Sequence, residues 1–216
     1  MLTCLPVAFD KCQKKERGYS IVVVVSPLVA IMKDQVSTYS IKGLKTTYMY
    51  VSQSGEVTDK SVLDEVSQGN FQLVFFTPEM LIGSKRWRNM LTGHLYSERL
   101  KAFVIDEAHC VKKWGTTFRH VLARVGEVRS LIPSSVHVMA LTATATSSDR
   151  IAVTQMIGLQ NPYTLKQAPS KPNIVYQIGS FKTVPDTFKK IADRLSFCQP
   201  PGCTRHPRIP AVWSLT

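Results

Sequence analysis

The sequence Phe103-Val104-Ile105-Asp106-Glu107-Ala108-His109 joins an apolar, β-branched run to two adjacent carboxylates and a histidine. The apolar part predicts a buried strand that ends at Ile105, because short runs rich in Val, Ile and Phe are typical of strands covered on both faces. At such a strand end, Asp106 can hold a hydrated Mg²⁺ ion and Glu107 can position and deprotonate a water molecule. The alternative is a strand that ends in an ordinary polar turn.

Four further short apolar runs alternate with stretches of helical periodicity, which predicts an α/β fold with a mostly parallel sheet flanked by helices on both faces. The expected strands are residues 21–25, 46–51, 73–76, 102–105 and 138–141. The expected helices are residues 28–40, 57–67, 79–91, 118–131 and 149–157. Because parallel strands end at one edge of the sheet, the loops Ser26-Pro27, Thr77-Pro78 and Thr142 to Thr146 are expected beside Asp106.

The composition fits a globular protein with an anionic partner. The chain has 216 residues, of which 44% are hydrophobic and 19% charged, and these values exclude wholesale disorder, collagen and disulfide scaffolds. Its 27 Lys and Arg and 15 Asp and Glu residues give a net charge of +12, which favours nucleic acid as a partner. Half of that excess lies in residues 166–216, with 8 basic and 2 acidic residues, and a basic unstructured end explains it equally well.

No apolar run, Ile21 to Val25 included, approaches the roughly 20 residues of a membrane-spanning helix, so no membrane partner is expected. Five scattered cysteines favour a reducing compartment, and we expect the nucleus, or the cytosol in a prokaryote. We predict three segments: a domain over residues 1–165, a linker and the start of a second domain over residues 166–197, and a disordered or non-native tail over residues 198–216. Cys198, Cys203 and His206 in that tail lack the fourth ligand of a structural zinc site.

A second motif supports the first. Ala140 to Thr146 is an apolar run that enters small hydroxyl residues, and it reads alternatively as a turn with Ser147 or Ser148 as the helix N-cap. Together with Asp106 to His109 it resembles motifs II and III of superfamily 2 helicases. The longer stretch from Asp106 to Arg119, Asp-Glu-Ala-His-Cys-Val-Lys-Lys-Trp-Gly-Thr-Thr-Phe-Arg, resembles motif II and the aromatic-rich loop of the RecQ family. Ser26 to Val36 resembles motif Ia, Thr77-Pro78-Glu79 motif Ib, and Lys171 to Tyr176 the entry to a second helicase domain.

This resemblance implies a three-layer RecA-like P-loop NTPase domain, with ATP, Mg²⁺ and DNA, including single strands and duplex junctions, as ligands. Asp106 would bind Mg²⁺ through water, Glu107 would be the catalytic base, and His109 would link the nucleotide state to interdomain contacts. Coupling is implied for Thr142, Ala143 and Thr144. The residues implied in DNA binding are Ser26, Pro27, Thr77, Pro78, Glu79, Trp114, Phe118 and Arg119. The alternatives are core packing for the two aromatic residues and simple turns at Ser26 and Thr77.

The sequence contains no Gly-Lys-Ser or Gly-Lys-Thr string, which this class needs to hold the β and γ phosphates. By the family's spacing that loop and the first strand would stand before Met1, and the second RecA-like lobe would follow the chain. We therefore expect a fragment, truncated at both ends, of an ATP-dependent 3′–5′ DNA helicase of repair or recombination, with little or no unwinding by itself. The alternatives are a non-catalytic nucleic-acid-binding remnant and, less favoured by the aromatic-rich loop, a DEAH-type RNA helicase. Protein partners are unknown from the sequence.

Overall fold

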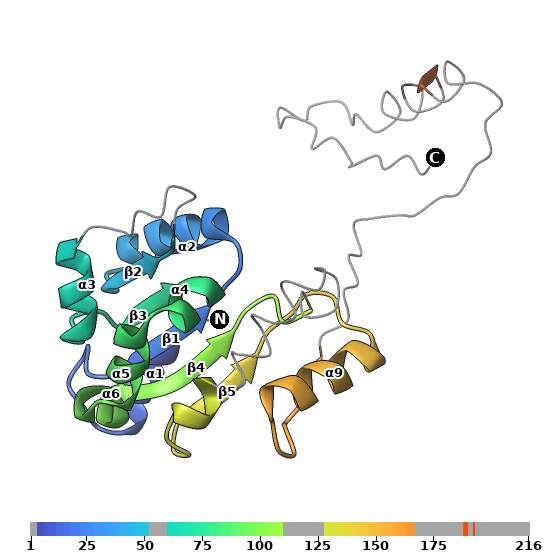
Figure 1. The fold of residues 1–216 in the computed structure, drawn as a ribbon. Coiled ribbons are helices and arrows are strands. Elements are labelled where there is room, and N and C mark those ends of the chain that lie inside the picture. Colours follow the sequence, from blue (N-terminus) through green and yellow to red (C-terminus); the bar gives the residue numbers. More distant parts are fainter. Residues whose placement is uncertain (1–3, 52–59, 110–127, 167–187, 190–191, 193–216) are drawn as a thin grey trace. The chain divides into compact units, whose positions relative to one another are not determined.

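The computed structural model of the chain describes residues 4–51, 60–109, 128–166, 188–189 and 192 (Figure 1). The chain divides into two units, Met1–Thr164 and Leu165–Thr216. All the helices and strands discussed below belong to the first unit. The linker, second-domain and tail assignments beyond residue 166 fall almost entirely outside the described residues and stay predictions.

Five parallel strands form one sheet in the first unit. They are β1 (Ile21–Val25), β2 (Thr46–Met49), β3 (Leu73–Phe76), β4 (Leu100–Ile105) and β5 (His137–Ala140). Their order in the sheet is β2-β3-β1-β4-β5, and every pairing is parallel. The α/β fold class and the strand at each of the five predicted positions are therefore confirmed. The carboxyl ends of all five strands share one edge of the sheet.

Helices cover both faces of this sheet (Figure 1). They are α1 (Leu5–Cys12), α2 (Val29–Ile41), α3 (Lys60–Ser67), α4 (Pro78–Gly83), α5 (Lys85–Thr92), α6 (His94–Arg99) and α9 (Ser147–Ile157). One core cluster packs α3 to α6 and α9 against the sheet, and its largest members include Trp87, Tyr96 and Phe103. The other cluster packs α1 and α2 against the opposite face through Met32 and the partly buried Phe9. The result is the three-layer arrangement that the sequence pattern predicts.

The single helix expected over residues 79–91 is wrong. The structure has α4 and α5 there, followed by α6, because the backbone is extended at Ser84 (φ −108°, ψ 124°) and again at Gly93 (φ −68°, ψ 155°). Gly83 precedes the first break, and glycine in a helix interior costs about 1 kcal/mol relative to alanine. The apolar periodicity runs across both breaks, so periodicity alone could not detect them.

The predicted N-cap of α9 is also wrong. Thr146, rather than Ser147 or Ser148, caps the helix, and its hydroxyl accepts a hydrogen bond from the Asp149 amide at 3.2 Å. Asp149 completes a capping box by accepting the Thr146 amide at 3.0 Å. A carboxylate at N3 favours a hydroxyl three residues earlier as its partner, and this reciprocal pairing selects Thr146.

Asp10 fixes the loop that leads from α1 into β1. Its side chain is only 3% exposed, and its two oxygens accept the amides of Gly18 at 2.8 Å and Ser20 at 2.7 Å. Because a buried carboxylate requires partners, these two amides explain why an acidic residue is tolerated in the core. They also place the carboxyl end of α1 at the amino edge of the sheet.

We expect Asp10→Ala to lower the free energy of unfolding by about 2–3 kcal/mol, since it leaves two amide donors without their charged acceptor. Urea denaturation followed by circular dichroism measures this change. Glu16→Ala, on an exposed residue of the same loop, is the control and is expected to change stability by less than about 0.5 kcal/mol. Equal effects of the two substitutions would contradict the assignment.

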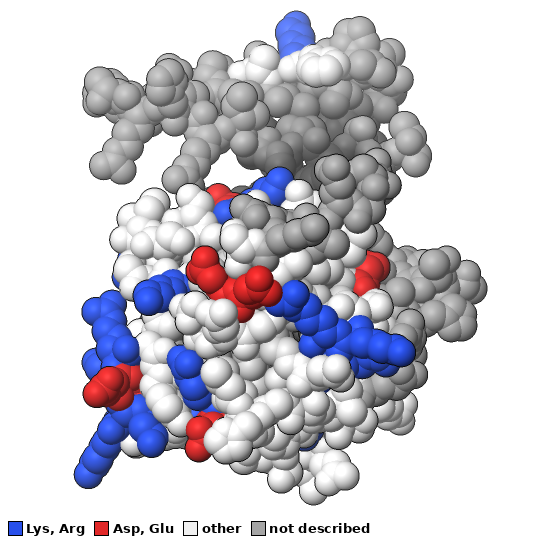
Figure 2. Space-filling model, turned by 60° about the vertical axis from the view of Figure 1, so that its left-hand side comes forward, with Lys and Arg blue, Asp and Glu red and all other residues white. Residues whose placement is uncertain are grey.

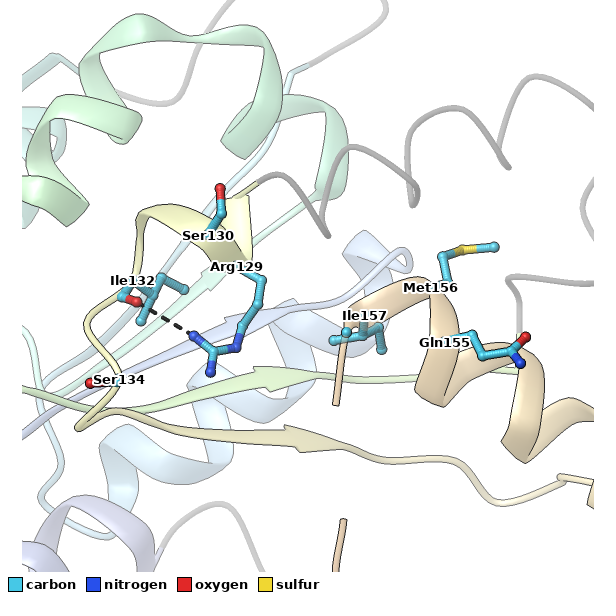
Figure 3. Close-up of a pocket in the computed structure, with 8 residues that line it drawn as sticks. Arg129, Ser130, Ile132, Ser134, Gln155, Met156 and Ile157 are labelled. Atoms are coloured by element: carbon cyan, nitrogen blue, oxygen red, sulfur yellow. Dashed lines mark hydrogen bonds between the residues drawn. The ribbon is translucent and has the colours of Figure 1, made fainter. Parts of the chain in front are cut away.

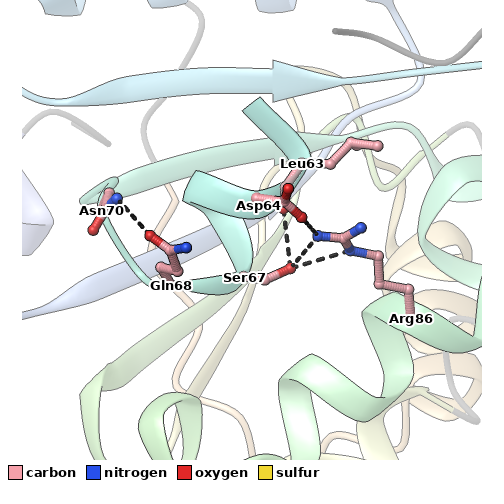
Figure 4. A network of polar contacts seen from close by, with 6 residues as sticks. All are labelled: Leu63, Asp64, Ser67, Gln68, Asn70 and Arg86. Carbon is pink, nitrogen blue, oxygen red and sulfur yellow. Dashed lines mark hydrogen bonds and ion pairs between the residues drawn. The ribbon is translucent and has the colours of Figure 1, made fainter. Parts of the chain in front are cut away.

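A polar network on the surface joins α3 to α5 (Figure 4). The Arg86 guanidinium lies 2.6 Å from Asp64 Oδ1 and donates to Ser67 Oγ at 3.0 Å and 3.2 Å. The side chains of Arg86 and Asp64 are 41% and 68% exposed, so water screens the pair. We expect Arg86→Ala to lower stability by at most about 1 kcal/mol, measured by urea denaturation. A loss that is larger and unchanged in 1 M salt would contradict a screened ion pair.

Candidate active site at the carboxyl edge of the sheet

The two predicted catalytic carboxylates follow β4 directly. The backbone holds Asp106 in the sheet, because its amide donates to Val25 O of the neighbouring β1 at 2.8 Å. Asp106 Oδ1 accepts the Glu107 amide at 3.0 Å, and Asp106 Oδ2 lies 3.5 Å from the hydroxyl of Ser26 at the end of β1. Asp106 is therefore oriented from both sides, with its carboxylate at the sheet edge.

Glu107 has a strained backbone. Its φ of +50° lies in the left-handed region, which a side chain other than glycine, asparagine or aspartate rarely adopts. Such strain costs on the order of 1–3 kcal/mol and is concentrated at functional sites. Within the described part of the chain, Glu107 Oε2 is buried and makes no hydrogen bond, while His109 Nδ1 lies 3.0 Å from it. With this backbone conformation the chain leaves the extended path of β4 at Glu107, and the Glu107 side chain lies beside His109.

His109 connects the β4 loop to the loop after β5. Its Nδ1 lies 3.0 Å from Thr142 Oγ1 as well as 3.0 Å from Glu107 Oε2. The Thr142 hydroxyl donates to Thr144 O at 3.2 Å and accepts the Thr144 amide at 3.2 Å, so its own loop holds it in place. The Ala108 amide donates to Leu141 O at 2.9 Å and reinforces the connection. A change in the position of Glu107 can therefore be transmitted to Thr142 through one histidine.

The structure brings Tyr39 of α2 into the surroundings of Asp106, which the sequence did not predict. Burial raises the pKa of Tyr39 above its ordinary value, and the negative charge of Asp106 raises it further. Tyr39 also stacks on Phe75 of β3, with ring centroids 6.3 Å apart. The Tyr39 side chain is therefore a neutral phenol at neutral pH, and it lies near the Asp106 carboxylate. Tyr39 stands three residues after the stretch that resembles motif Ia, on the same helix α2, and no motif marks it.

The structure shows what Ser26 and Thr77 contact, which the sequence alone does not indicate. Ser26 is fully buried, and its amide donates to Phe76 O at 2.9 Å. Thr77 is 6% exposed; its hydroxyl caps α4 by accepting the Met80 amide at 3.4 Å, and its amide donates to Met49 O at 3.0 Å. Both residues therefore have a positioning role, and contact of their side chains with DNA stays a prediction.

The remaining predicted residues divide into described and undescribed ones. Pro78 is buried, Pro27 is half-buried and Glu79 is exposed, while Ala143 and Thr144 are exposed beside Thr142. Trp114, Phe118 and Arg119, with the rest of the aromatic-rich loop, lie outside the described residues. Their assignment to DNA stays a prediction.

The residues at this edge fit a magnesium ion. Mg²⁺ usually takes one or two carboxylates, together with water and substrate phosphates, and Asp106 offers a carboxylate held in place by the Glu107 amide and faced by the Ser26 hydroxyl. The beginning of α1 lies at the same edge, because Asp10 near its end is tied to the amino edge. The described ranges contain no cluster of three or more His, Cys, Asp or Glu side chains that could hold a metal ion.

A separate pocket of about 420 Å³ lies at the opposite edge (Figure 3). It is lined by Arg129 and Ile132, which precede β5, and by Met156, Ile157 and Gly158 at the end of α9. Arg129 donates to Ile132 O at 3.4 Å, and its guanidinium points toward Ile132. The pocket contains none of the carboxylate-edge residues and is not part of the candidate active site. In the part of the chain that the structure describes, no helix is long and apolar enough to cross a membrane.

A parallel three-layer α/β domain with an Asp-Glu pair at the end of a central strand defines the class of nucleotide-hydrolysing motor domains. The model of the family "DEAD/DEAH box helicase" matches residues 2–151. The chain belongs to this family.

Its curated relatives include DNA helicases of the RecQ type. The chain is 32% identical over 157 residues to "ATP-dependent DNA helicase RecQ" of Pasteurella multocida, a match that covers 72% of this chain and 24% of the relative. It is 33% identical over 178 residues to "ATP-dependent DNA helicase Q-like 4B" of Arabidopsis thaliana, covering 80% of this chain and 15% of the relative. The chain thus spans a quarter or less of the length of these relatives.

Solved structures support the RecA-like fold. The Mycobacterium smegmatis helicase Lhr bound to ssDNA and AMP-PNP superposes with a TM-score of 0.51 at 16% identity, over 90% of this chain and 27% of that one. Dbp5 of S. cerevisiae bound to RNA and ADP BeF3 has a TM-score of 0.52 at 15% identity, over 77% of this chain and 39% of that one. At these identities the likeness extends to the fold alone.

Proposed function

We propose that this chain is the first motor lobe of a RecQ-type, ATP-dependent 3′–5′ DNA helicase that acts in repair or recombination in the nucleus, or in the cytosol of a prokaryote. The observation that carries the proposal is the connection from Glu107 through His109 to Thr142, with both contacts at 3.0 Å. It joins a candidate base to the loop after the next strand, which is what coupling of hydrolysis to movement requires.

The geometry of the site supports the following roles for its residues. Asp106 would hold Mg²⁺ through water, and the ion would neutralise developing charge on the transferred phosphoryl group. Glu107 would accept a proton from the attacking water, and His109 and Thr142 would respond to its charge. The Ser26 hydroxyl would orient Asp106. Single strands and duplex junctions would pass over the same edge, with Pro27, Glu79, Ala143 and Thr144 nearby.

The 216 residues alone are expected to bind DNA without hydrolysing ATP or unwinding a duplex, because the sequence holds no Gly-Lys-Ser or Gly-Lys-Thr loop to grip the phosphates. The motor function is tested in a chimaera in which residues 4–166 replace the matching segment of the Pasteurella multocida relative. We expect this chimaera to hydrolyse ATP when single-stranded DNA is added and to unwind a duplex with a 3′ overhang. A chimaera that folds and binds DNA but turns over no ATP would contradict the proposal and favour a non-catalytic nucleic-acid-binding module.

A further inference from the structure

A group of cations surrounds Tyr19 at the amino edge of the sheet, opposite the carboxylate edge. Lys15 Nζ lies 4.9 Å from the centre of the Tyr19 ring, Arg99 Cζ 5.5 Å and Lys101 Nζ 5.8 Å. Tyr19 precedes β1, while Arg99 ends α6 and Lys101 is the second residue of β4. Three positive charges therefore meet at one aromatic ring, where each has a favourable cation–π contact and all three repel one another.

Arg99 is rigidly built into this group. Its guanidinium donates to Tyr19 O at 2.8 Å and to Gly18 O at 3.0 Å. Gly69, with φ +70°, packs so closely that a Cβ there would lie 3.1 Å from Arg99 Nη1 and 2.6 Å from Leu95 Cδ2. The carbonyl groups orient the guanidinium without neutralising it. Gly69 leaves the space beside the guanidinium that a side chain would fill.

Lys101 is placed by an irregularity of the sheet. In the β1–β4 pairing, Ile21 is opposite Leu100 but Val22 is opposite Ala102, so Lys101 is the additional residue of a bulge. Bulges redirect the side chain of the additional residue, and here Lys101 Nζ reaches Glu98 O at 2.6 Å beside the Tyr19 ring. The distortion has no other evident use, since the regular pairing resumes at Val22.

These charges have no acidic partner among the described residues. The only acidic side chains on the loop from α1 to β1 and on α6 are Glu16 and Glu98, both exposed, and neither forms an ion pair in the described ranges. The buried carboxylate of Asp10, which binds the amides of Gly18 and Ser20, adds one negative charge near the three cations and forms no ion pair with them. The cluster keeps a net positive charge, which raises the local concentration of an anionic ligand.

The cluster continues toward β2. Arg17 Nη2 reaches the turn after α2, where it lies 3.6 Å from the Cβ position of Gly43, and the exposed Lys42 and Lys45 flank this turn. The Tyr19 patch is defined here as Lys15, Arg17, Tyr19, Lys42, Lys45, Arg99 and Lys101. On the face shown in Figure 2, groups of Lys and Arg lie on both sides of a small acidic area.

We propose that the Tyr19 patch is a second nucleic-acid contact of this domain, which binds the phosphates of a single strand at the edge opposite the motor site. The proposed function places DNA only at the carboxyl edge of the sheet. The inference rests on that function and adds a second DNA contact at the amino edge. Lys15, Arg99 and Lys101 all lie within 5.8 Å of one ring centre, so they span at most about 12 Å. A nucleic acid strand carries one negative charge at every nucleotide, so it meets these cations with any sequence. An extended peptide would do the same only if every second residue carried a carboxylate on the side that faces the patch.

The test uses the purified 216-residue chain and a fluorescein-labelled dT30 oligonucleotide, with binding followed by anisotropy between 50 and 300 mM NaCl and no nucleotide present. We expect Lys15→Gln/Lys101→Gln to weaken binding at 100 mM salt about tenfold and to lower the slope of log K against log salt by about 1.4, since each lost phosphate contact contributes about 0.7. The control, Lys85→Gln/Arg88→Gln, removes the same charge from α5 and is expected to change affinity less than twofold. Equal losses in both variants, or no loss in either, would overturn the proposal.

A second measurement needs no variant. We expect dT30 to slow the acetylation of Lys15 and Lys101 by acetic anhydride at least threefold, measured by mass spectrometry, and to leave Lys85 unchanged. Absence of protection would overturn the proposal. So would binding of poly-glutamate that depends on Lys15 and Lys101 while dT30 binding does not, because the patch would then be a site for an acidic protein. Both assays omit ATP, so a failure of the motor function would leave these outcomes distinct.

Discussion

Glu107→Gln is expected to lower DNA-stimulated ATP hydrolysis by the chimaera about 10²- to 10⁴-fold, the contribution of a general base to such a reaction. The substitution keeps the size of the side chain and removes the charge that would accept a proton from water. Its Oε2 atom is buried and lies 3.0 Å from His109 Nδ1, so an amide there also weakens the contact with the imidazole. We therefore expect the stimulation by DNA to fall along with the basal rate.

The measurement is a coupled ATPase assay with and without dT30, accompanied by DNA binding of the same preparations. Binding of DNA is expected to stay within twofold of the parent, because Glu107 stands among the hydrolytic groups. Glu65→Gln, on the exposed face of α3, is the matched control and is expected to leave the rate unchanged. A Glu107→Gln protein with more than a third of the parent rate would exclude Glu107 as the base. In that event the strained φ of +50° would need another explanation.

The sequence predicted the strands better than the helices. Ile21–Val25 and Leu73–Phe76 were predicted to the residue, because a strand covered on both faces must be apolar throughout and the pattern ends where burial ends. Helix boundaries depend on single residues such as Ser84, where the backbone becomes extended, and Thr146, which forms a capping box with Asp149. A periodic pattern averages over such residues. The break between α4 and α5 and the cap of α9 were therefore missed.

The candidate site was predictable where chemistry follows directly from a strand. Asp106 and Glu107 continue β4, and Thr142 follows β5, so the parallel sheet brings them to one edge. Tyr39 and the Tyr19 patch could not be predicted in this way. Tyr39 reaches the region of Asp106 only through the packing of α2, and the patch joins residues about 80 positions apart through a register shift in the sheet. No local pattern encodes a register shift.

Trp87→Ala is expected to have the largest effect on stability, a loss of about 3–5 kcal/mol in the free energy of unfolding. Trp87 is fully buried in α5 and meets Phe76 of β3 edge-on, with ring centroids 5.1 Å apart. Removing the indole would leave a cavity directly against a central strand, beside the β3 end that Thr77 continues. Since a whole domain is typically stable by only about 5–15 kcal/mol, much of the variant would be unfolded under mild denaturant.

The indole nitrogen allows a sharper test of the same site. Trp87 Nε1 is buried and finds no hydrogen-bond partner among the described residues, so part of the burial energy of Trp87 is offset by an unsatisfied donor. Trp87→Phe keeps the aromatic contact with Phe76 and removes that donor, and we expect it to cost only about 1–2 kcal/mol, well below the alanine variant. Ile151→Ala, at a side chain that is 60% exposed on α9, is the control and is expected to cost less than about 0.5 kcal/mol. Urea denaturation followed by far-UV circular dichroism measures all three. An equal loss of unfolding free energy in the phenylalanine and alanine variants would contradict this account. It would mean that the indole N–H has a hydrogen-bond partner in solution and that the aromatic contact with Phe76 contributes little to stability.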